Sequence, residues 1–520
     1  MSGVEDLSRD ELIELVGQLV AANTELRARV AKLEHLLSRN SSNSSSPPSK
    51  DDLPGKTPPA PKNRRGPAGR AQGKQKGAPG ANLAWSDAPD QRKDRFPEGA
   101  CECGQDLGSA MDLGVVDRYQ QVEIPLVVAE LTQFNQHAVA CRCGKVHTAT
   151  RPEGARPGPV GYGPNLQAWA VFLMVAHHVP VHRCVLILES LTGAKPSVGF
   201  VHGMLKRTAA ALGEVHDRIR ALIALAYVVV MDETPLRVGP KKPKPGRKKA
   251  DKYLLVACTD LYTLYLLGDR DLDTFKKSVL SDLAAAGATV VHDRYHLYDN
   301  PVFAATEAAV VEAAEASVPG VVHQLCCAHL CRDLDDAGEV YPDQHWPRQT
   351  AEALRALIHA RNHAQHEAGL AATADPSGHD GRYCRYCITG APTKPISELL
   401  RSFRQGVLVG LSATLNHAGR PGEQKARLLL ECLHDRETDV LRFLSDPAVP
   451  PTSNIAEREL RPSKIQQNIS GRLRSEERTQ DRYTILGYLT TATKHGIHTM
   501  NALRDTLTGR PWIPAPATPT

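Results

Sequence analysis

Two aspartates stand at the ends of strand-like segments in the middle of the chain. Asp232 follows the apolar run of YVVVMDET (227–234), and Asp293 follows that of ATVVHDRYHLY (288–298). Carboxylate oxygens on rigid strands are ligands that Mg²⁺ prefers, and two such ions about 3.5–4 Å apart can support phosphoryl transfer. A third carboxylate is needed, and Glu457 lies near the start of a helical pattern in PPTSNIAERELRPSKIQQN (450–468). Together these residues predict a magnesium site for phosphoryl transfer.

Each carboxylate also has a structural alternative. An Asp at a strand end is commonly a turn former or a helix cap. Glu457 could instead complete a capping box with Asn454. Glu233 and Glu459 are adjacent competitors, but Glu233 should point to the opposite side of the strand from Asp232, and Glu459 lies well around the helix from Glu457.

The segments around the aspartates predict the sheet that would position them. Strand patterns occur at 227–234, 252–260, 263–269, 288–298 and 321–326, and a helical pattern covers 273–287. Three strands in a meander, a helix and a further strand is the ribonuclease H-like order. In that fold the first and fourth strands are neighbours at the centre of the sheet, so Asp232 and Asp293 should meet.

The whole chain is expected to be multidomain α/β. The ribonuclease H-like catalytic core should comprise 226–335 and 450–500, interrupted by a helical insertion (336–449) and followed by a C-terminal tail (501–520). A helical domain (151–225) should precede the core. Its helix, turn and second helix could contact DNA, although packing without DNA contact is an equal alternative.

The N-terminal residues 1–38 predict a coiled coil. Within 10–38, the d positions of a heptad repeat are Leu12, Leu19, Leu26 and Leu33, and Asn23 falls at an a position. This pattern favours a two-stranded coil and hence a homodimer or higher multimer, the alternative being an amphipathic helix packed on its own domain. Residues 39–95, rich in Ser, Pro, Gly and basic residues, predict a disordered basic linker.

Two tight cysteine pairs mark a zinc-ribbon-like DNA-binding module at 96–150. Cys101 and Cys103 precede a strand-like stretch (119–140), and Cys141 and Cys143 follow it. Four thiolates could hold one structural Zn²⁺. The alternative is a pair of reduced cysteine turns, and His137 or His147 could replace a missing ligand.

A second cysteine group could form another zinc site that ties the helical insertion to the core. Its members are Cys326, Cys327, His329, Cys331, Cys384 and Cys387. Buried free cysteines are the alternative.

Composition and charge set the expected compartment and partner. No apolar run reaches the 18 or so residues that a membrane span needs, and the acidic start of the chain lacks the pattern of a secretory signal, so a cytoplasmic location without membrane contact is expected. The net charge of +5 is small, but basic residues gather in blocks at 61–77, 240–249 and 461–474. Such blocks suit DNA phosphates, although a charge run is more often a solvated surface.

The order of these motifs resembles transposases of the insertion-sequence 66 family over nearly the whole chain. The coiled coil is followed by NSSNSSSPPSKD (40–51) and by the paired cysteines. The further motifs are Asp232-Glu233-Thr234, Asp293-x-Tyr295-x-x-Tyr298, Cys326-x-Ala328-His329 and Asn454-x-Ala456-Glu457-Arg458-x-Leu460-Arg461-Pro462. The chain departs from the family pattern at Pro235-Leu236, where a Gly-Trp-like pair is usual, and in its C-x-C spacing, where C-x-x-C is usual.

The resemblance implies a DDE transposase whose catalytic Asp, Asp and Glu fall on Asp232, Asp293 and Glu457. Two Mg²⁺ ions, which Mn²⁺ could replace, would activate water to free a 3′-hydroxyl that attacks target DNA. A nucleoid-associated multimer would bind the element's terminal inverted repeats, with accessory proteins of the same element as further partners. Expected phosphate contacts come from Lys241, Lys242, Lys244, Arg247, Lys248, Lys249, Arg458, Arg461, Lys464, Arg472 and Arg474. The alternatives are a catalytically inactive, transposase-derived DNA-binding regulator and a stand-alone nuclease.

Overall fold

The computed structural model describes residue 23 and residues 85–516, except 125, 154, 156–157, 241–251, 306–318, 368–393 and 416–420. Several predictions therefore lie outside the described residues. They are the coiled coil apart from Asn23, most of the linker, the basic residues from Lys241 to Lys249, and Cys384 and Cys387. Residue contacts divide the chain into two compact units, Met1–Glu123 and Ile124–Thr520, and each is described by itself.

The described part of the first unit is mostly irregular backbone. Its one short helical turn among these residues is the 3₁₀ helix η3 (Leu107–Ser109), which Asp106 caps by accepting a hydrogen bond from the Gly108 amide. Ser86 and Gln120 join the two ends of this part, because the Ser86 amide donates to the Gln120 side chain at 2.9 Å.

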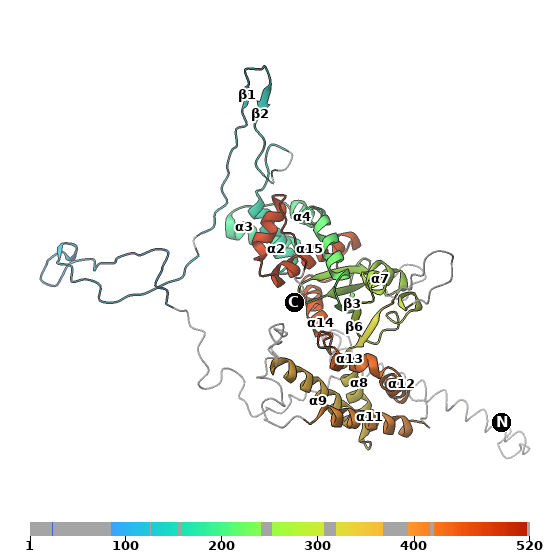
Figure 1. The fold of residues 1–520 in the computed structure, drawn as a ribbon. Coiled ribbons are helices and arrows are strands. Elements are labelled where there is room, and N and C mark those ends of the chain that lie inside the picture. The colour runs from blue at the N-terminus through green and yellow to red at the C-terminus, as the bar shows by residue number, and fades with distance from the viewer. Residues whose placement is uncertain are drawn as a thin grey trace, which may run out of the picture. The chain divides into compact units, whose positions relative to one another are not determined.

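The second unit is built on a mixed five-stranded sheet (Figure 1). The strands are β3 (Val228–Leu236), β4 (Lys252–Cys258), β5 (Thr263–Gly268), β6 (Thr289–His292) and β7 (Val322–Leu325). Their order across the sheet is β5-β4-β3-β6-β7, with β3 antiparallel to β4 and β4 to β5, whereas β6 is parallel to both β3 and β7. All five expected strands are therefore present, and β3 and β6 are neighbours.

Helices precede, interrupt and follow this sheet. Those before it are α2 (Pro164–Val175), α3 (Val181–Thr192), α4 (Val198–Ala211) and α5 (Gly213–Ala224). Between its strands lie α6 (Leu272–Lys277), α7 (Leu280–Ala286) and the 3₁₀ helix η4 (Pro301–Phe303). After it come α8 (Cys327–Val340), α9 (Trp346–Glu367), α11 (Ile396–Ala413), α12 (Pro421–Asp435), α13 (Glu437–Ser445), α14 (Asn454–Ile469), α15 (Glu476–Lys494) and α16 (Thr499–Leu507).

Two hydrophobic clusters hold these elements together. The larger joins α2–α5 and α14–α16 to the sheet, with Tyr265, Phe275 and Tyr483 among its buried aromatic residues. The second joins α8, α9, α11, α12 and α13 around fully buried Trp346 and Phe403. In Figure 1, α9 and α11 run beside each other below the sheet, with α8 against them. The segment between β7 and α14 thus has its own core.

The strand expectation for 119–140 was wrong over most of its length. Among the described residues of this stretch, only β1 (Ala138–Ala140) is a strand, and it pairs with β2 (Val146–Thr148). The apolar side chains before it remain exposed, with Leu126 at 96% and Leu131 at 93%. A strand pattern requires a partner strand, and the described residues supply none before Ala138.

The helical predictions gave the correct type of element but joined helices that the structure separates. The expected helix at 273–287 is divided into α6 and α7, because Ser278 is extended and the Lys277 and Ser278 carbonyls accept hydrogen bonds from Arg220, each at 2.9 Å. Before the sheet, where two helices joined by a turn were expected, the structure has the four helices α2–α5. His178, whose φ of 58° is left-handed, interrupts the first of them ahead of Pro180.

Candidate active site

Asp232 and Asp293 lie opposite each other on neighbouring parallel strands. The register pairs Val230 of β3 with Val291 of β6, and two residues further along each strand are Asp232 and Asp293. Asp293 follows the last residue of β6, and its Oδ1 accepts a hydrogen bond from the Tyr295 amide at 2.9 Å, which fixes the turn. The sheet therefore brings the two aspartates together, as the strand order requires.

The charge of this pair is poorly compensated. Burial, followed by the negative charges of Glu233 and Asp293, raises the pKa of Asp232 to about 7. The Glu233 amide, which donates to Asp232 Oδ1 at 2.8 Å, and His329 act in the opposite direction but do not outweigh these effects. A buried carboxylate that holds its proton this strongly indicates an environment in which a cation would be stabilised.

Glu457 lies in the first turn of α14, and it does not form the capping box with Asn454. Ser453, rather than Asn454, is the N-cap residue, and the Glu457 amide already bonds to the Ser453 carbonyl within the helix. The Glu457 carboxylate instead accepts a hydrogen bond from Arg332 at 2.9 Å, and its Oε1 lies 3.8 Å from His329 Nε2. The carboxylate thus faces α8 and is not used to cap its own helix.

His329 of α8 connects Glu457 electrostatically with Asp232. Its contact with the Cys326 thiol raises the pKa of the imidazole, and burial only partly opposes this. Burial alone would raise the pKa of Cys326, but His329 and Ser453 lower it overall, and the Ser453 amide donates to its sulfur at 3.2 Å. Cys326 and His329, which the sequence offers as members of a second zinc group, contact each other beside Glu457.

Glu233 occupies a separate buried ion pair. Its side chain is 1% exposed and accepts hydrogen bonds from Arg270 at 2.5 Å and from the Tyr298 hydroxyl at 3.1 Å. The Arg270 guanidinium stacks on the Tyr295 ring, 3.6 Å from its centroid. These partners explain the two tyrosines of the Asp293-x-Tyr295-x-x-Tyr298 motif, to which spacing alone had assigned no role.

Glu459 faces away from Glu457 into the main core. Its carboxylate pairs with Lys494 of α15 at 3.1 Å, and both side chains are nearly buried, at 12% and 14% exposed. Its backbone carbonyl accepts a hydrogen bond from the Tyr265 hydroxyl at 2.7 Å. Glu459 is therefore placed to join α14, α15 and β5, and not to reach the aspartates.

We expect Glu459→Gln to lower the free energy of unfolding by on the order of 3 kcal/mol, because it leaves the buried Lys494 ammonium without its counter-charge. Urea denaturation followed by circular dichroism measures this. Glu457→Gln is the matched control: its partner Arg332 is 60% exposed, so a change below about 1 kcal/mol is expected. Equal stability losses in the two variants would contradict the placement of Glu459 in a nearly buried ion pair with Lys494.

The basic residues expected to bind phosphate divide into two groups. Arg461, Lys464 and Arg474 are exposed. Although Lys464 is exposed as a whole, partial burial of its charged group lowers its pKa and the charge of Asp232 opposes this. Lys464 therefore lies near that aspartate, two turns of α14 beyond Glu457. Arg472, in contrast, donates to the Val238 carbonyl at 3.2 Å and stabilises the base of the β3–β4 connection. Arg458 is half-buried and also has a partner.

The two exposed cysteine pairs adopt the same turn, one in each unit. The Cys101 and Cys141 amides donate to the carbonyls of Gln105 and Lys145, each at 2.8 Å, and the following Gly104 and Gly144 amides donate back to the cysteine carbonyls. Gly104 and Gly144 have φ values of 90° and 82°, which favour glycine. Hydrogen bonds from the backbone and side chain of the second cysteine lower the pKa of Cys101 and Cys141. Each turn therefore presents thiols suited to a metal.

The second cysteine group is divided between two environments. Cys327 and Cys331 are buried in the helical cluster around Trp346, and burial raises the pKa of Cys331 to about 11. The Cys327 thiol donates to the Val440 carbonyl at 3.5 Å. Cys326, in contrast, contacts His329 and accepts a hydrogen bond from the Ser453 amide.

Two stretches of the chain match known protein families. None of the described helices is both long and apolar enough to cross a membrane. Comparison with curated proteins gave no match. Residues 3–84 match a family of unknown function, DUF6444. Residues 160–481 match the model described as Transposase IS66 family, which covers the sheet, α8–α14 and all three candidate carboxylates. The chain belongs to the IS66 family of transposases.

Proposed function

We propose that this transposase is a DDE enzyme, in which Asp232, Asp293 and Glu457 hold two Mg²⁺ ions, or Mn²⁺ in their place, for DNA strand cleavage and strand transfer. The observation that carries the proposal is the position of Asp232 and Asp293 on neighbouring parallel strands, where the negative charges of Asp293 and Glu233 lie beside Asp232. Oxygen donors with excess negative charge fit a hard divalent cation. The strand order β5-β4-β3-β6-β7 supports a ribonuclease H-like core.

Bound ions would activate the attacking oxygen and stabilise the leaving oxygen of the phosphodiester. The protein's own residues position the reactants around them. Asp232 and Asp293 are fixed by the sheet, while Glu457 is fixed by α14 and by Arg332 of α8. His329 supplies positive charge between Asp232 and Glu457 when these carboxylates are ionised.

DNA would approach along α14. Arg461 and Lys464 lie one and two turns beyond Glu457 and are exposed, and Arg474 follows the helix. Their charges suit phosphates next to the reacting bond. Arg472 contributes indirectly, because it donates to the Val238 carbonyl just before the basic residues 241–249. Binding of both terminal inverted repeats by a multimer, through the N-terminal coiled coil, and recruitment of accessory proteins complete this proposal.

A strand-transfer assay tests the proposed function. The full chain is incubated with labelled DNA carrying the element's terminal inverted repeats, target DNA and Mg²⁺. We expect cleavage at the repeat ends and joined product, both lost when EDTA replaces Mg²⁺. Binding of the ends without either product would favour the inactive regulator, and cleavage without joining would favour a nuclease.

We further propose that Cys101, Cys103, Cys141 and Cys143 bind one structural Zn²⁺, since the two turns present matched pairs of exposed thiols. Cys141→Ser in the full chain should lower zinc by one equivalent and weaken binding to the element ends more than binding to unrelated DNA. Atomic emission and filter binding measure these effects under reducing conditions. Cys184→Ser, at a buried thiol, is the control. Unchanged zinc in Cys141→Ser would leave the turns without a metal role.

A further inference from the structure

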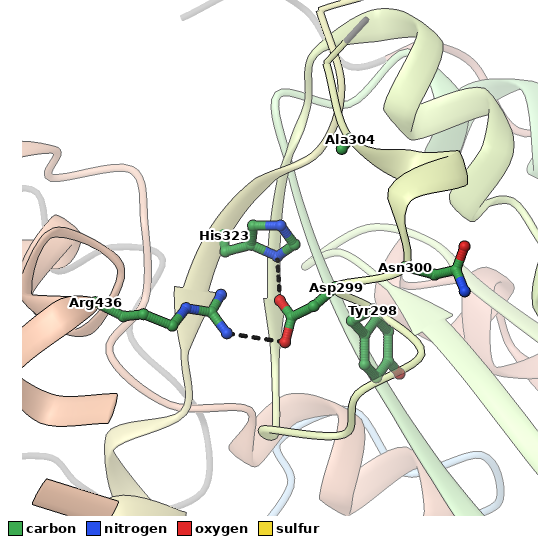
Figure 2. Close-up of a pocket in the computed structure, with 6 residues that line it drawn as sticks. All are labelled: Tyr298, Asp299, Asn300, Ala304, His323 and Arg436. Carbon is green, nitrogen blue, oxygen red and sulfur yellow. Dashed lines mark hydrogen bonds and ion pairs between the residues drawn. The ribbon is translucent and has the colours of Figure 1, made fainter. Parts of the chain in front are cut away.

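Two histidines and an aspartate meet at the edge of a cavity of about 410 Å³ near the ends of β6 and β7. One donor atom from each of His292, Asp299 and His323 lies within 4.8 Å of the others. The cavity is lined by Tyr298, Asp299, Asn300, Ala304, His323 and Arg436, and Figure 2 shows Asp299 lying between His323 and Arg436. This cluster has no part in the chemistry proposed above.

Hydrogen bonding fixes which nitrogen of His292 can bind a metal. His292 Nδ1 contacts the Asp293 backbone carbonyl, which can only accept, so Nδ1 carries the proton. The other nitrogen, Nε2, therefore presents its lone pair to His323 Nδ1, 2.9 Å away. In metal sites, the histidine nitrogen that does not bind the ion commonly donates its proton to a backbone carbonyl, and this bond orients the ring.

The other two donors are also held in place from outside. Asp299 Oδ2 accepts a hydrogen bond from Arg436 at 2.9 Å, while Oδ1 lies 3.9 Å from His323 Nδ1, too far for a hydrogen bond. Arg436 is itself oriented by Asp439 at 2.9 Å. Arg442 donates to the backbone carbonyl of His323 at 2.8 Å. Helix α13 and the residue before it thus support the ligand set.

We propose that His292 Nε2, His323 Nδ1 and Asp299 Oδ1 bind one transition-metal ion, with Zn²⁺ the best match and a water in the cavity as the fourth ligand. Two imidazoles, one carboxylate and an open position are a usual zinc set, whereas Mg²⁺ prefers oxygen alone. Tetrahedral Zn–N bonds of about 2.0–2.1 Å place the two nitrogens roughly 3.3 Å apart. The rings need to separate by only a few tenths of an ångström, and His323 changes tautomer, so that its proton moves from Nδ1 to Nε2 by exchange with water.

The ion would brace the strand end that carries Asp293. His292 directly precedes Asp293 and stacks on Tyr298, with ring centroids 4.3 Å apart, and Tyr298 donates to Glu233. Arg436, at the start of α13, links the same cluster to the helical segment. The proposed zinc is therefore a positioning element that would connect this segment to the sheet.

The test measures zinc in the full chain. Each protein is stripped with a chelator, loaded with excess Zn²⁺, freed of unbound metal by gel filtration and analysed by atomic emission. His323→Gln and Asp299→Ala should each contain one equivalent less zinc than the wild type. His296→Gln, an exposed histidine four residues from His292, is the matched control and should bind the wild-type amount.

Co²⁺ substitution distinguishes this site from the cysteine pairs. The difference spectrum between the wild type and Asp299→Ala should contain d–d bands without a thiolate charge-transfer band, because no sulfur is among the ligands. Asp299 is exposed, so its replacement decides the question even if His323→Gln fails to fold. Equal zinc in the wild type and Asp299→Ala would overturn the site and leave a hydrogen-bonded cluster only.

Discussion

Glu457→Gln is expected to bind element ends normally and to lose strand cleavage and joining by at least about 10²–10³-fold, the loss typical when one electrostatic contact to developing charge is removed. A neutral amide is a poor Mg²⁺ ligand, yet it can still accept the hydrogen bond from Arg332. Because Glu457 does not cap α14, this substitution should leave the helix start unchanged. Strand-transfer rates and filter binding on the full chain provide the two measurements.

Arg332→Gln is the control that separates a metal ligand from a structural ion pair. It removes the partner of Glu457 but keeps the carboxylate, so activity should stay within about tenfold of the wild type, since an exposed ion pair contributes little. Near-normal strand transfer by Glu457→Gln would exclude this residue from the site. Equal loss in both variants would show that the ion pair, and not metal binding, is what the reaction needs.

Asp232→Asn should abolish strand transfer and, in metal-free buffer, make the protein more stable. The wild-type fold holds a buried carboxyl whose pKa is raised to about 7 from 3.8. At pH 8 this carboxyl is ionised, and the neutral amide avoids the cost of burying that charge and its repulsion by Glu233 and Asp293, together about 2–4 kcal/mol. Urea denaturation in EDTA measures the gain, and Asp343→Asn, in an exposed loop, should show none.

The raised pKa of Asp232 also determines how the stability gain of Asp232→Asn changes with pH. A carboxyl that binds its proton more strongly in the folded state adds stability that is fully present below pH 4 and is lost as the pH rises through 7. The advantage of Asp232→Asn should therefore grow between pH 4 and pH 7. Mg²⁺ should stabilise the wild type but not the variant. An advantage that is constant with pH would contradict the raised pKa.

The sheet could be predicted because its strands are short apolar runs with clear ends. Asp232 and Asp293 each follow such a run, and the strand order alone makes them neighbours. The same reasoning failed at 119–137, because alternation predicts a strand only where a partner strand exists. The division of α6 from α7 depends on Arg220, which is distant in sequence and gave no local signal.

Side-chain partners within the site could not be predicted from spacing. Arg270 and Tyr298 bind Glu233 across more than thirty residues, and Arg332 meets Glu457 only after α8 and α14 have packed. The sequence is equally consistent with a capping box between Asn454 and Glu457, which the helix start at Asn454 excludes. The cluster of His292, Asp299 and His323 matches no motif, because its members come from a strand, a loop and a second strand.

The position of α14 near the end of the chain affects when an active enzyme can exist. The ribosome makes β3 and β6 early, then the whole helical segment, and only afterwards the turn that carries Glu457. At about 5–20 residues per second, the third carboxylate follows the second by on the order of ten seconds. Helix α14 is also held by bonds to Tyr265 of β5 and Lys494 of α15, the latter made later still. The three candidate carboxylates can therefore be present together only after synthesis has passed α14, and the core that α14–α16 form with the sheet is completed later still.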